Sequence, residues 1–125
     1  MKAGQDFLAA NATKEGVIVT ASGLQYRVMK SGQGATPGPT DVVMAHYHGT
    51  FIDGKVFDSS VERGEPLALP VNGVISGWTE ALQMMQEGDQ WQLFVPSDLA
   101  YGARGVGPIP GNTALIFEVE LIEVK

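Results

Sequence analysis

The chain has 125 residues, the ordinary size of one globular domain, and 44% of them are hydrophobic. Its 14 acidic and 8 basic side chains give a net charge of −6, which would repel a phosphate backbone and argues against nucleic-acid binding. No apolar run approaches the roughly 20 residues of a membrane-spanning helix. Cysteine is absent, which excludes thiol nucleophiles, disulfides and cysteine-based zinc sites and leaves both a cytoplasmic and a periplasmic location open.

The N-terminal segment predicts a short helix. Gly4 to Lys14 is rich in helix formers, and Gly16 ends the pattern. The segment is too short to be stable alone and has little amphipathic character, so we expect it to be the end of a larger element. From residue 17 onward the period of the pattern changes to two, which is typical of strands.

The rest of the chain reads mainly as short strands separated by turns, as its 16 glycines and 7 prolines suggest. Alternation of apolar and polar residues predicts strands at 24–29, 42–51, 56–57, 67–69, 91–95 and 113–124. Asp53-Gly54 is a hairpin signal between the second and third of these strands. A loop is predicted at 31–39 and a polar excursion at 59–66.

One further helix is predicted at 74–85. Trp78, Leu82 and Met85 share one face there, and Gly88 follows. The segment from Ser97 to Asn112 is glycine-rich and unusually long for a linker in so small a domain. The expected fold is α+β, with five or six antiparallel strands wrapped around this one short helix and a short helix before them.

Two glycine-rich segments resemble nucleotide-binding loops but lack the required context. Gly49 to Lys55 has the glycine and lysine spacing of a phosphate-binding loop, yet Val56 replaces the serine or threonine that would bind magnesium, and a strand follows instead of a helix. A hairpin turn explains the segment better. Gly102 to Gly107 departs from the dinucleotide spacing, and no strand–helix pair surrounds it.

Candidate metal ligands and catalytic side chains are few. His46 and His48 lie two residues apart, hence on one face of a strand, but without a third ligand candidate a surface or hydrogen-bonding role fits them better than a metal. Asp58 and Glu62 could form the acid pair of a hydrolase, although a solvated loop explains them as well. Neither a metal nor a cofactor is predicted.

A set of apolar and aromatic residues remains, drawn from several elements: Tyr47, Phe57, Val74, Ile75, Trp78, Tyr101 and Phe117. Core packing is one interpretation. However, the two tyrosines would need hydrogen-bond partners if they were buried, and Asp58 directly follows an apolar residue. An aromatic basin with a few polar groups describes a ligand pocket equally well, so both interpretations stay open here.

Five motifs in order and spacing give the chain a resemblance to the FKBP family of peptidyl-prolyl isomerases, which bind tacrolimus and rapamycin. The motifs are His46-Tyr47-His48-Gly49, Asp53 to Ser60, Val74 to Trp78, Leu99-Ala100-Tyr101-Gly102 and Ala114 to Leu121. They cover about two-thirds of the chain, from Asp41 to the end. The lead-in from Thr20 to Val28 is similar to the bacterial branch called macrophage infectivity potentiator (Mip)-like. In that branch a long helix connects the isomerase domain to a dimerisation segment.

The resemblance implies a peptidyl-prolyl cis-trans isomerase domain over residues 17–125, preceded by the end of the linker helix over residues 1–16. The catalytic residues it implies are Asp58, Tyr101, Phe57 and Tyr47. The substrate-binding residues it implies are Val74, Ile75, Trp78, Phe117, Arg63, Leu67 and Ile109. Proline-containing peptides and unfolded proteins would be the substrates, and macrolides of the tacrolimus or rapamycin type the inhibitors.

The sequence departs from the family pattern at the rim of the implied pocket. Leu67 stands where an aromatic residue is frequent, Val106 stands where a histidine is often found, and the loop from 105 to 111 is one residue shorter than in eukaryotic members. Two other functions stay open: a chaperone-like module that binds proline-containing segments with little catalysis, and a purely structural domain. The whole protein is expected to be a homodimer in this branch, and this chain alone a monomer.

Overall fold

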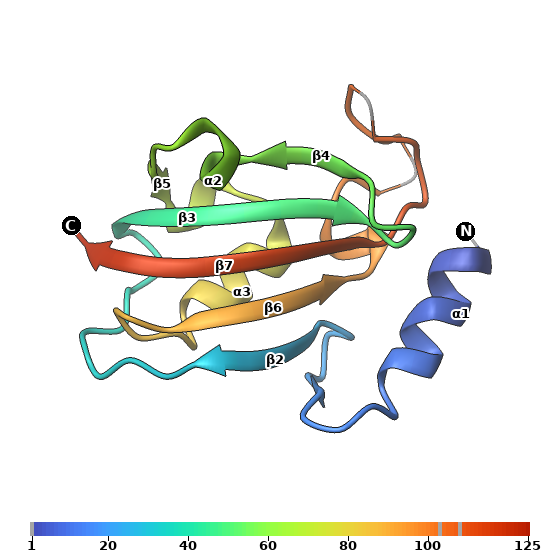
Figure 1. Cartoon of the computed structure of the whole chain (residues 1–125), viewed down its shortest axis with the longest axis horizontal. Helices are drawn as coiled ribbons and strands as arrows, with labels where there is room; N and C mark the ends of the chain where they lie inside the picture. The colour runs from blue at the N-terminus through green and yellow to red at the C-terminus, as the bar shows by residue number, and fades with distance from the viewer. Residues whose placement is uncertain (1, 103, 108) are drawn as a thin grey trace.

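A seven-stranded antiparallel sheet packs one face against a short helix (Figure 1). The computed structural model describes residues 2–102, 104–107 and 109–125. The helical segments are α1 (Lys2–Asn11), α2 (Ser60–Arg63), η1 (Val71–Gly73), α3 (Ser76–Leu82) and η2 (Ser97–Leu99). The strands are β1 (Ile18–Val19), β2 (Gln25–Lys30), β3 (Val42–Phe51), β4 (Val56–Ser59), β5 (Leu67–Pro70), β6 (Gln90–Val95) and β7 (Leu115–Val124).

The strand order is β1-β2-β6-β7-β3-β4, with β5 also paired to β3. This confirms the predicted α+β fold, with one strand more than the five or six expected. The additional strand is β1, whose two residues are too few to show an alternating pattern. The predicted hairpin turn also forms. The Phe51 N–H donates to the Lys55 carbonyl at 2.9 Å, and Gly54 adopts a φ of 91°, as a turn of this kind requires.

One edge of β3 is shared by two short strands. Residues 48–50 of β3 pair with β4, whereas residues 42–45 pair with β5. The chain leaves the sheet between these two strands and forms α2, a single helical turn within the polar excursion that the sequence predicted at 59–66. This break brings Ser60 of α2 beside His46 and Arg63 beside the hydroxyl of Tyr47, both on β3.

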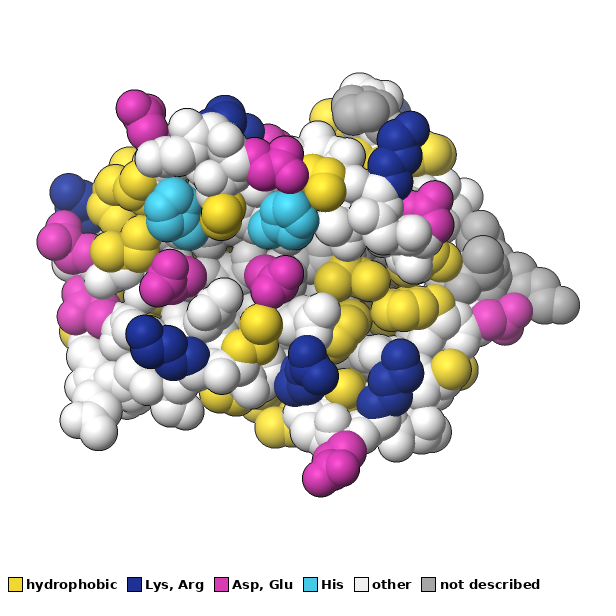
Figure 2. Space-filling model, in the orientation of Figure 1, with side chains coloured by type: hydrophobic (Ala, Val, Ile, Leu, Met, Phe, Trp, Pro, Cys, Tyr) yellow, Lys and Arg dark blue, Asp and Glu magenta, His cyan; other side chains and the backbone are white. Residues whose placement is uncertain are grey.

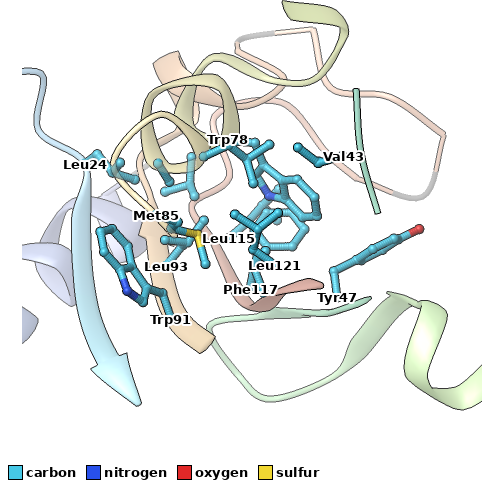
Figure 3. Packing of buried hydrophobic residues seen from close by; sticks show 14 of the residues in the cluster. Leu24, Val43, Tyr47, Trp78, Met85, Trp91, Leu93, Leu115, Phe117 and Leu121 are labelled. Carbon is cyan, nitrogen blue, oxygen red and sulfur yellow. The ribbon is translucent and has the colours of Figure 1, made fainter. Parts of the chain in front are cut away.

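The core lies between the inner face of the sheet and α3 (Figure 3). Trp78, Ala81 and Leu82 are buried on the helix face that meets the sheet. A side-chain carbon at Gly77 would lie 2.7 Å from Val95 Cγ1, so this glycine lets α3 approach β6 closely. The predicted helix at 74–85 is too long at both ends, because Val74 is extended and the chain beyond Leu82 forms turns.

Helix α1 lies beside the end of the sheet far from the C-terminus (Figure 1). The rings of Phe7 and Phe94 lie 6.1 Å apart between their centroids. Two buried polar side chains join the helix to β2: the amide of Asn11 donates to Gln25 Oε1 at 2.8 Å, and the Gln25 amide donates to the Leu8 carbonyl at 2.9 Å. No helix within the described part of the chain is long and apolar enough to cross a membrane.

Candidate active site

A hollow of ≈ 410 Å³ opens between the inner face of the sheet, the start of α3 and the loop after η2. Its lining is mainly apolar and aromatic, with one carboxylate and two phenol hydroxyls. The lining residues are Tyr47, Phe57, Asp58, Leu69, Gly73, Val74, Ile75, Trp78, Tyr101 and Phe117. All seven residues of the aromatic and apolar set from the sequence, together with Asp58, therefore meet in one place.

The floor of the hollow is built from rings that meet edge to face. Trp78 packs against Phe117 with ring centroids 5.2 Å apart and against Tyr47 at 5.3 Å (Figure 3). Such edge-to-face contacts fix the rings more firmly than unspecific apolar packing does. Within the described structure the buried indole N–H of Trp78 has no hydrogen-bond partner.

Phe57 and Phe117 form the wall against β3, and a glycine permits their position. The two rings meet at right angles with centroids 5.5 Å apart. A side-chain carbon at Gly49 would lie 2.7 Å from Phe57 Cζ and 2.9 Å from Phe117 Cε1, closer than real carbon atoms approach. The rings thus rest directly on the backbone of β3, so Gly49 contributes to the shape of the hollow.

A closed ring of hydrogen bonds supplies the polar side. The Tyr47 hydroxyl donates to Asp58 Oδ2 at 2.6 Å, Arg63 Nη1 donates to Asp58 Oδ1 at 2.5 Å, and Arg63 Nη2 donates to the Tyr47 hydroxyl at 3.0 Å. The three side chains come from β3, β4 and α2. The Arg63 guanidinium also lies 5.7 Å from the centre of the Tyr47 ring.

These contacts shift the pKa values of Asp58 and Tyr47 in opposite directions. Partial burial by itself raises the pKa of Asp58, but hydrogen bonds from Tyr47 and Arg63 and the positive charge of Arg63 outweigh it, so the pKa lies below its ordinary value. Burial and the hydrogen bond to Asp58 raise the pKa of Tyr47. Asp58 therefore stays a carboxylate at neutral pH, with both oxygens engaged.

Besides the Trp78 indole, two residues that line the hollow carry hydrogen-bond donors without a partner in the described structure. Tyr101, from the loop after η2, has a pKa raised by burial and by the negative charge of Asp58, and no hydrogen bond to its hydroxyl contributes to that shift. The backbone N–H of Ile75 precedes the first turn of α3 and makes no hydrogen bond to a described residue. Both donors could bind carbonyl groups of a ligand.

Three residues that the resemblance implied do not line the hollow. Arg63 lies behind Asp58 and Tyr47, to which it is hydrogen-bonded. Leu67 is half-buried against the core, and Ile109 is buried near Val106, with which it forms an isolated backbone bridge. Conversely, the sequence analysis missed Leu69 and Gly73. The alternation in β5 puts Leu69 on the same face as Leu67, and this signal could have found it.

The two histidines lie on the opposite, outer face of the sheet, as the alternation along β3 predicted. Figure 2 shows them on this face with a hydrophobic side chain between them and acidic side chains next to them. No group of three potential ligands that could hold a metal ion occurs among the described residues. Glu62, the proposed partner of Asp58 in an acid pair, is exposed on α2 and does not line the hollow.

Comparison with known proteins identifies the family. Residues 33–122 match the family model described as FKBP-type peptidyl-prolyl cis-trans isomerase. The chain belongs to the FKBP-type peptidyl-prolyl cis-trans isomerases. Residues 1–28 match a second family model, described as the domain amino terminal to FKBP-type peptidyl-prolyl isomerase.

Relatives from several bacteria resemble almost the whole chain. The FKBP-type isomerase FkpA of Aeromonas hydrophila is 56% identical over 124 residues, which are 99% of this chain and 46% of that protein. The outer membrane protein MIP of Legionella longbeachae is 54% identical over 123 residues, 98% of this chain and 53% of that protein. The crystal structure of FkpA from Escherichia coli superposes with a TM-score of 0.96 at 44% identity, covering 99% of this chain and 58% of that chain.

These relatives confirm the predicted family of FKBP-type isomerases, its bacterial Mip-like branch and the fold. The chain spans about half the length of the curated relatives it matches. The roles of the individual site residues and the domain boundary after residue 16 stay predictions.

Proposed function

We propose that this FKBP-type domain accelerates rotation about X–Pro peptide bonds in the hollow above Trp78. The observation that carries the proposal is an apolar basin with an aromatic floor, flanked by two unengaged donors, the Ile75 N–H and the Tyr101 hydroxyl. A proline ring fits an aromatic floor, and the carbonyl groups beside it need donors of this kind.

The chemistry demands little more than such a basin. An X–Pro amide rotates through a twisted form that has lost resonance, over a barrier of about 18–20 kcal/mol. No covalent bond breaks, so binding that favours the twisted form over the planar form is sufficient. The twisted amide is less polar than the planar one, and transfer from water into an apolar hollow therefore costs it less.

Seven of the predicted site residues then have roles in the proposed reaction. Trp78 and Phe117 hold the proline ring, while the Ile75 amide and the Tyr101 hydroxyl fix neighbouring carbonyl groups in the twisted geometry. Asp58 supplies a fixed negative charge beside the rotating carbonyl carbon, and Tyr47 and Arg63 hold it in place. An acceleration of about a million-fold requires roughly 8 kcal/mol from these effects together.

We propose proline-containing peptides and unfolded proteins as substrates, and macrolides of the tacrolimus or rapamycin type as ligands that compete for the same hollow. The peripheral residues Leu67 and Ile109 would act at its rim. For the whole protein we propose a homodimer, in which residues 1–16 end the helix that connects the two parts; this chain alone would be a monomer. The name of the relative MIP, an outer membrane protein, supports the periplasmic alternative over the cytoplasmic one.

The proposed activity is tested by exchange NMR on a short X–Pro peptide, with and without catalytic amounts of the protein. We expect acceleration of cis-to-trans exchange that tacrolimus abolishes. The Asp58→Ala variant should lose turnover more than it loses stability. If the folded protein binds the peptide without acceleration, the chaperone-like binding module replaces the proposed function. Acceleration that persists at saturating tacrolimus would place the reaction outside the hollow.

A further inference from the structure

The outer face of β3 is joined to the pocket by hydrogen bonds that run through α2. His46 and His48 project outward from β3, and each contacts one serine at the junction of β4 and α2. That helix ends in Arg63, which holds Asp58 and Tyr47. We propose that His46 and His48 are positioning residues for the reaction, acting through Ser59, Ser60 and Arg63 on the Tyr47–Asp58 pair.

The strand register creates the first contact. His48 lies directly opposite Ser59 in the antiparallel pair of β3 and β4, so both side chains point to the outer face. His48 Nδ1 and Ser59 Oγ share a hydrogen bond of 2.9 Å. Ser59 is also the N-cap of α2, because its hydroxyl accepts the N–H of Glu62 at 3.1 Å. His48 thereby orients the residue that starts the helix.

The second contact is deeper. Ser60 is fully buried, and its hydroxyl shares a hydrogen bond of 3.0 Å with His46 Nδ1. The same hydroxyl accepts the backbone N–H of Tyr47 at 2.7 Å and contacts the Tyr47 carbonyl at 3.2 Å. The histidine, the serine and the pocket tyrosine are thus joined at one buried oxygen atom.

Helix α2 needs this support because it is too short to be stable alone. A helix of four residues lies far below the length that is stable in water. Its last residue, Arg63, has a side chain that is 48% exposed, so packing does little to hold the guanidinium in place. The position of α2 therefore decides whether Arg63 reaches both Asp58 and Tyr47.

At each histidine, a pair of variants separates the effect of the hydrogen bond from the effect of the ring's bulk. His46→Phe and His48→Phe keep a ring but remove the polar atom, whereas His46→Asn and His48→Asn retain a polar atom close to the position of Nδ1. Glu118, the register partner of His48 on β7, lies on the same outer face, so Glu118→Gln is a matched control.

The inference rests on the proposed isomerase function, and the first readout is peptide turnover. We expect the phenylalanine variants to lower kcat about 3- to 10-fold with little change in KM, a loss like that of a single hydrogen bond. The asparagine variants and Glu118→Gln should stay near the wild-type rate. In an Arg63→Ala background His48→Phe should cause no further loss, because its effect passes through α2 and Arg63. His46→Phe should retain part of its effect there, because Ser60 also joins His46 directly to the Tyr47 backbone.

The inference would be overturned if the loss from His48→Phe were fully additive with that from Arg63→Ala, or if the lost turnover of the phenylalanine variants only followed their unfolded fraction. A second readout is independent of turnover: the side-chain Nε–H NMR signal of Arg63, one of three arginines in the chain. The phenylalanine variants should shift and broaden this signal. An unchanged signal would contradict the inference. A wild-type protein without turnover but with the expected signal changes would refute the proposed function and leave the hydrogen-bonded path standing.

Discussion

Gly49→Ala tests directly whether the aromatic wall of the hollow rests on the backbone of β3. The added carbon would lie 2.7 Å from Phe57 Cζ and 2.9 Å from Phe117 Cε1, whereas ordinary contact begins at 3.4 Å, so Phe57 must move by about 0.7 Å. Phe117 is only 4% exposed and is packed against Trp78, which leaves it little room. Phe57 is half-buried at the edge of the hollow and will give way into it.

The expected magnitudes follow from this geometry. Forcing a methyl group into packed rings costs about 1–3 kcal/mol of stability, which corresponds to a drop in Tm of roughly 3–5 °C per kcal/mol for a domain of this size. A narrowed hollow should lower kcat/KM about tenfold, equivalent to about 1.4 kcal/mol of transition-state stabilisation.

The assay combines thermal unfolding with exchange NMR on an X–Pro peptide. Gly38→Ala is the matched control, because it makes the same chemical change where the new carbon meets only Asp41 Oδ2 at 3.5 Å, and its φ lies outside the left-handed region. The control should behave like the wild type. Wild-type turnover and stability in Gly49→Ala would refute the derived shape of the hollow.

Three further predictions concern the pH dependence of the site, the hydroxyl group of Tyr101 and the attachment of the N-terminal helix α1. Because the pKa of Asp58 is lowered from 3.8, its contribution to stability is complete above that value and is lost as the pH falls through the lower folded value. The pKa values of Tyr47 and Tyr101 are raised from 10.0, so none of these three groups should titrate between about pH 5 and 9. A step in kcat/KM within that window that persists after both histidines are replaced by phenylalanine would contradict these assignments. Tyr101→Phe should lower kcat/KM about 3- to 10-fold, with a change in unfolding free energy below about 0.5 kcal/mol, because only a bound ligand engages its hydroxyl; equal losses in both measurements would make the residue structural. Asn11→Ala should lower the unfolding free energy by about 1–3 kcal/mol, since it leaves buried Gln25 Oε1 without its donor, and should spare turnover; unchanged urea unfolding would show that α1 is not fixed to the domain.

Strong alternation of apolar and polar residues made the long central strand β3 predictable. The bounds expected for β3 agree with the structure, and the same pattern put Tyr47 inside and the two histidines outside. The helix expected from residue 74 was wrong at its start for an instructive reason. Val74 and Ile75 fit the apolar period of the helix, but they are extended and line the hollow instead. Periodicity reports which side chains are buried, and pocket residues and core residues give the same signal.

Local sequence patterns could not predict the polar side of the site. The ring of Tyr47, Asp58 and Arg63 depends on the break between β4 and β5 and on α2, a helix too short to leave a periodic signature. The resemblance to a known family suggested these residues, whereas composition and spacing left core and pocket undecided. The serine–histidine contacts likewise depend on strand register, which follows from long-range pairing.

The most direct test of the account is an NMR titration of the ¹⁵N-labelled protein with an X–Pro peptide, with peptide exchange recorded in the same samples. The account predicts catalysed exchange together with saturable shifts of the Ile75 amide and the Trp78 indole N–H. Tacrolimus should abolish the exchange and replace the peptide-bound positions of these two signals with positions of its own, because it occupies the same hollow. Catalysed exchange with these two signals unmoved, or with the peptide-induced shifts confined to the outer face around His46 and His48, would contradict the account.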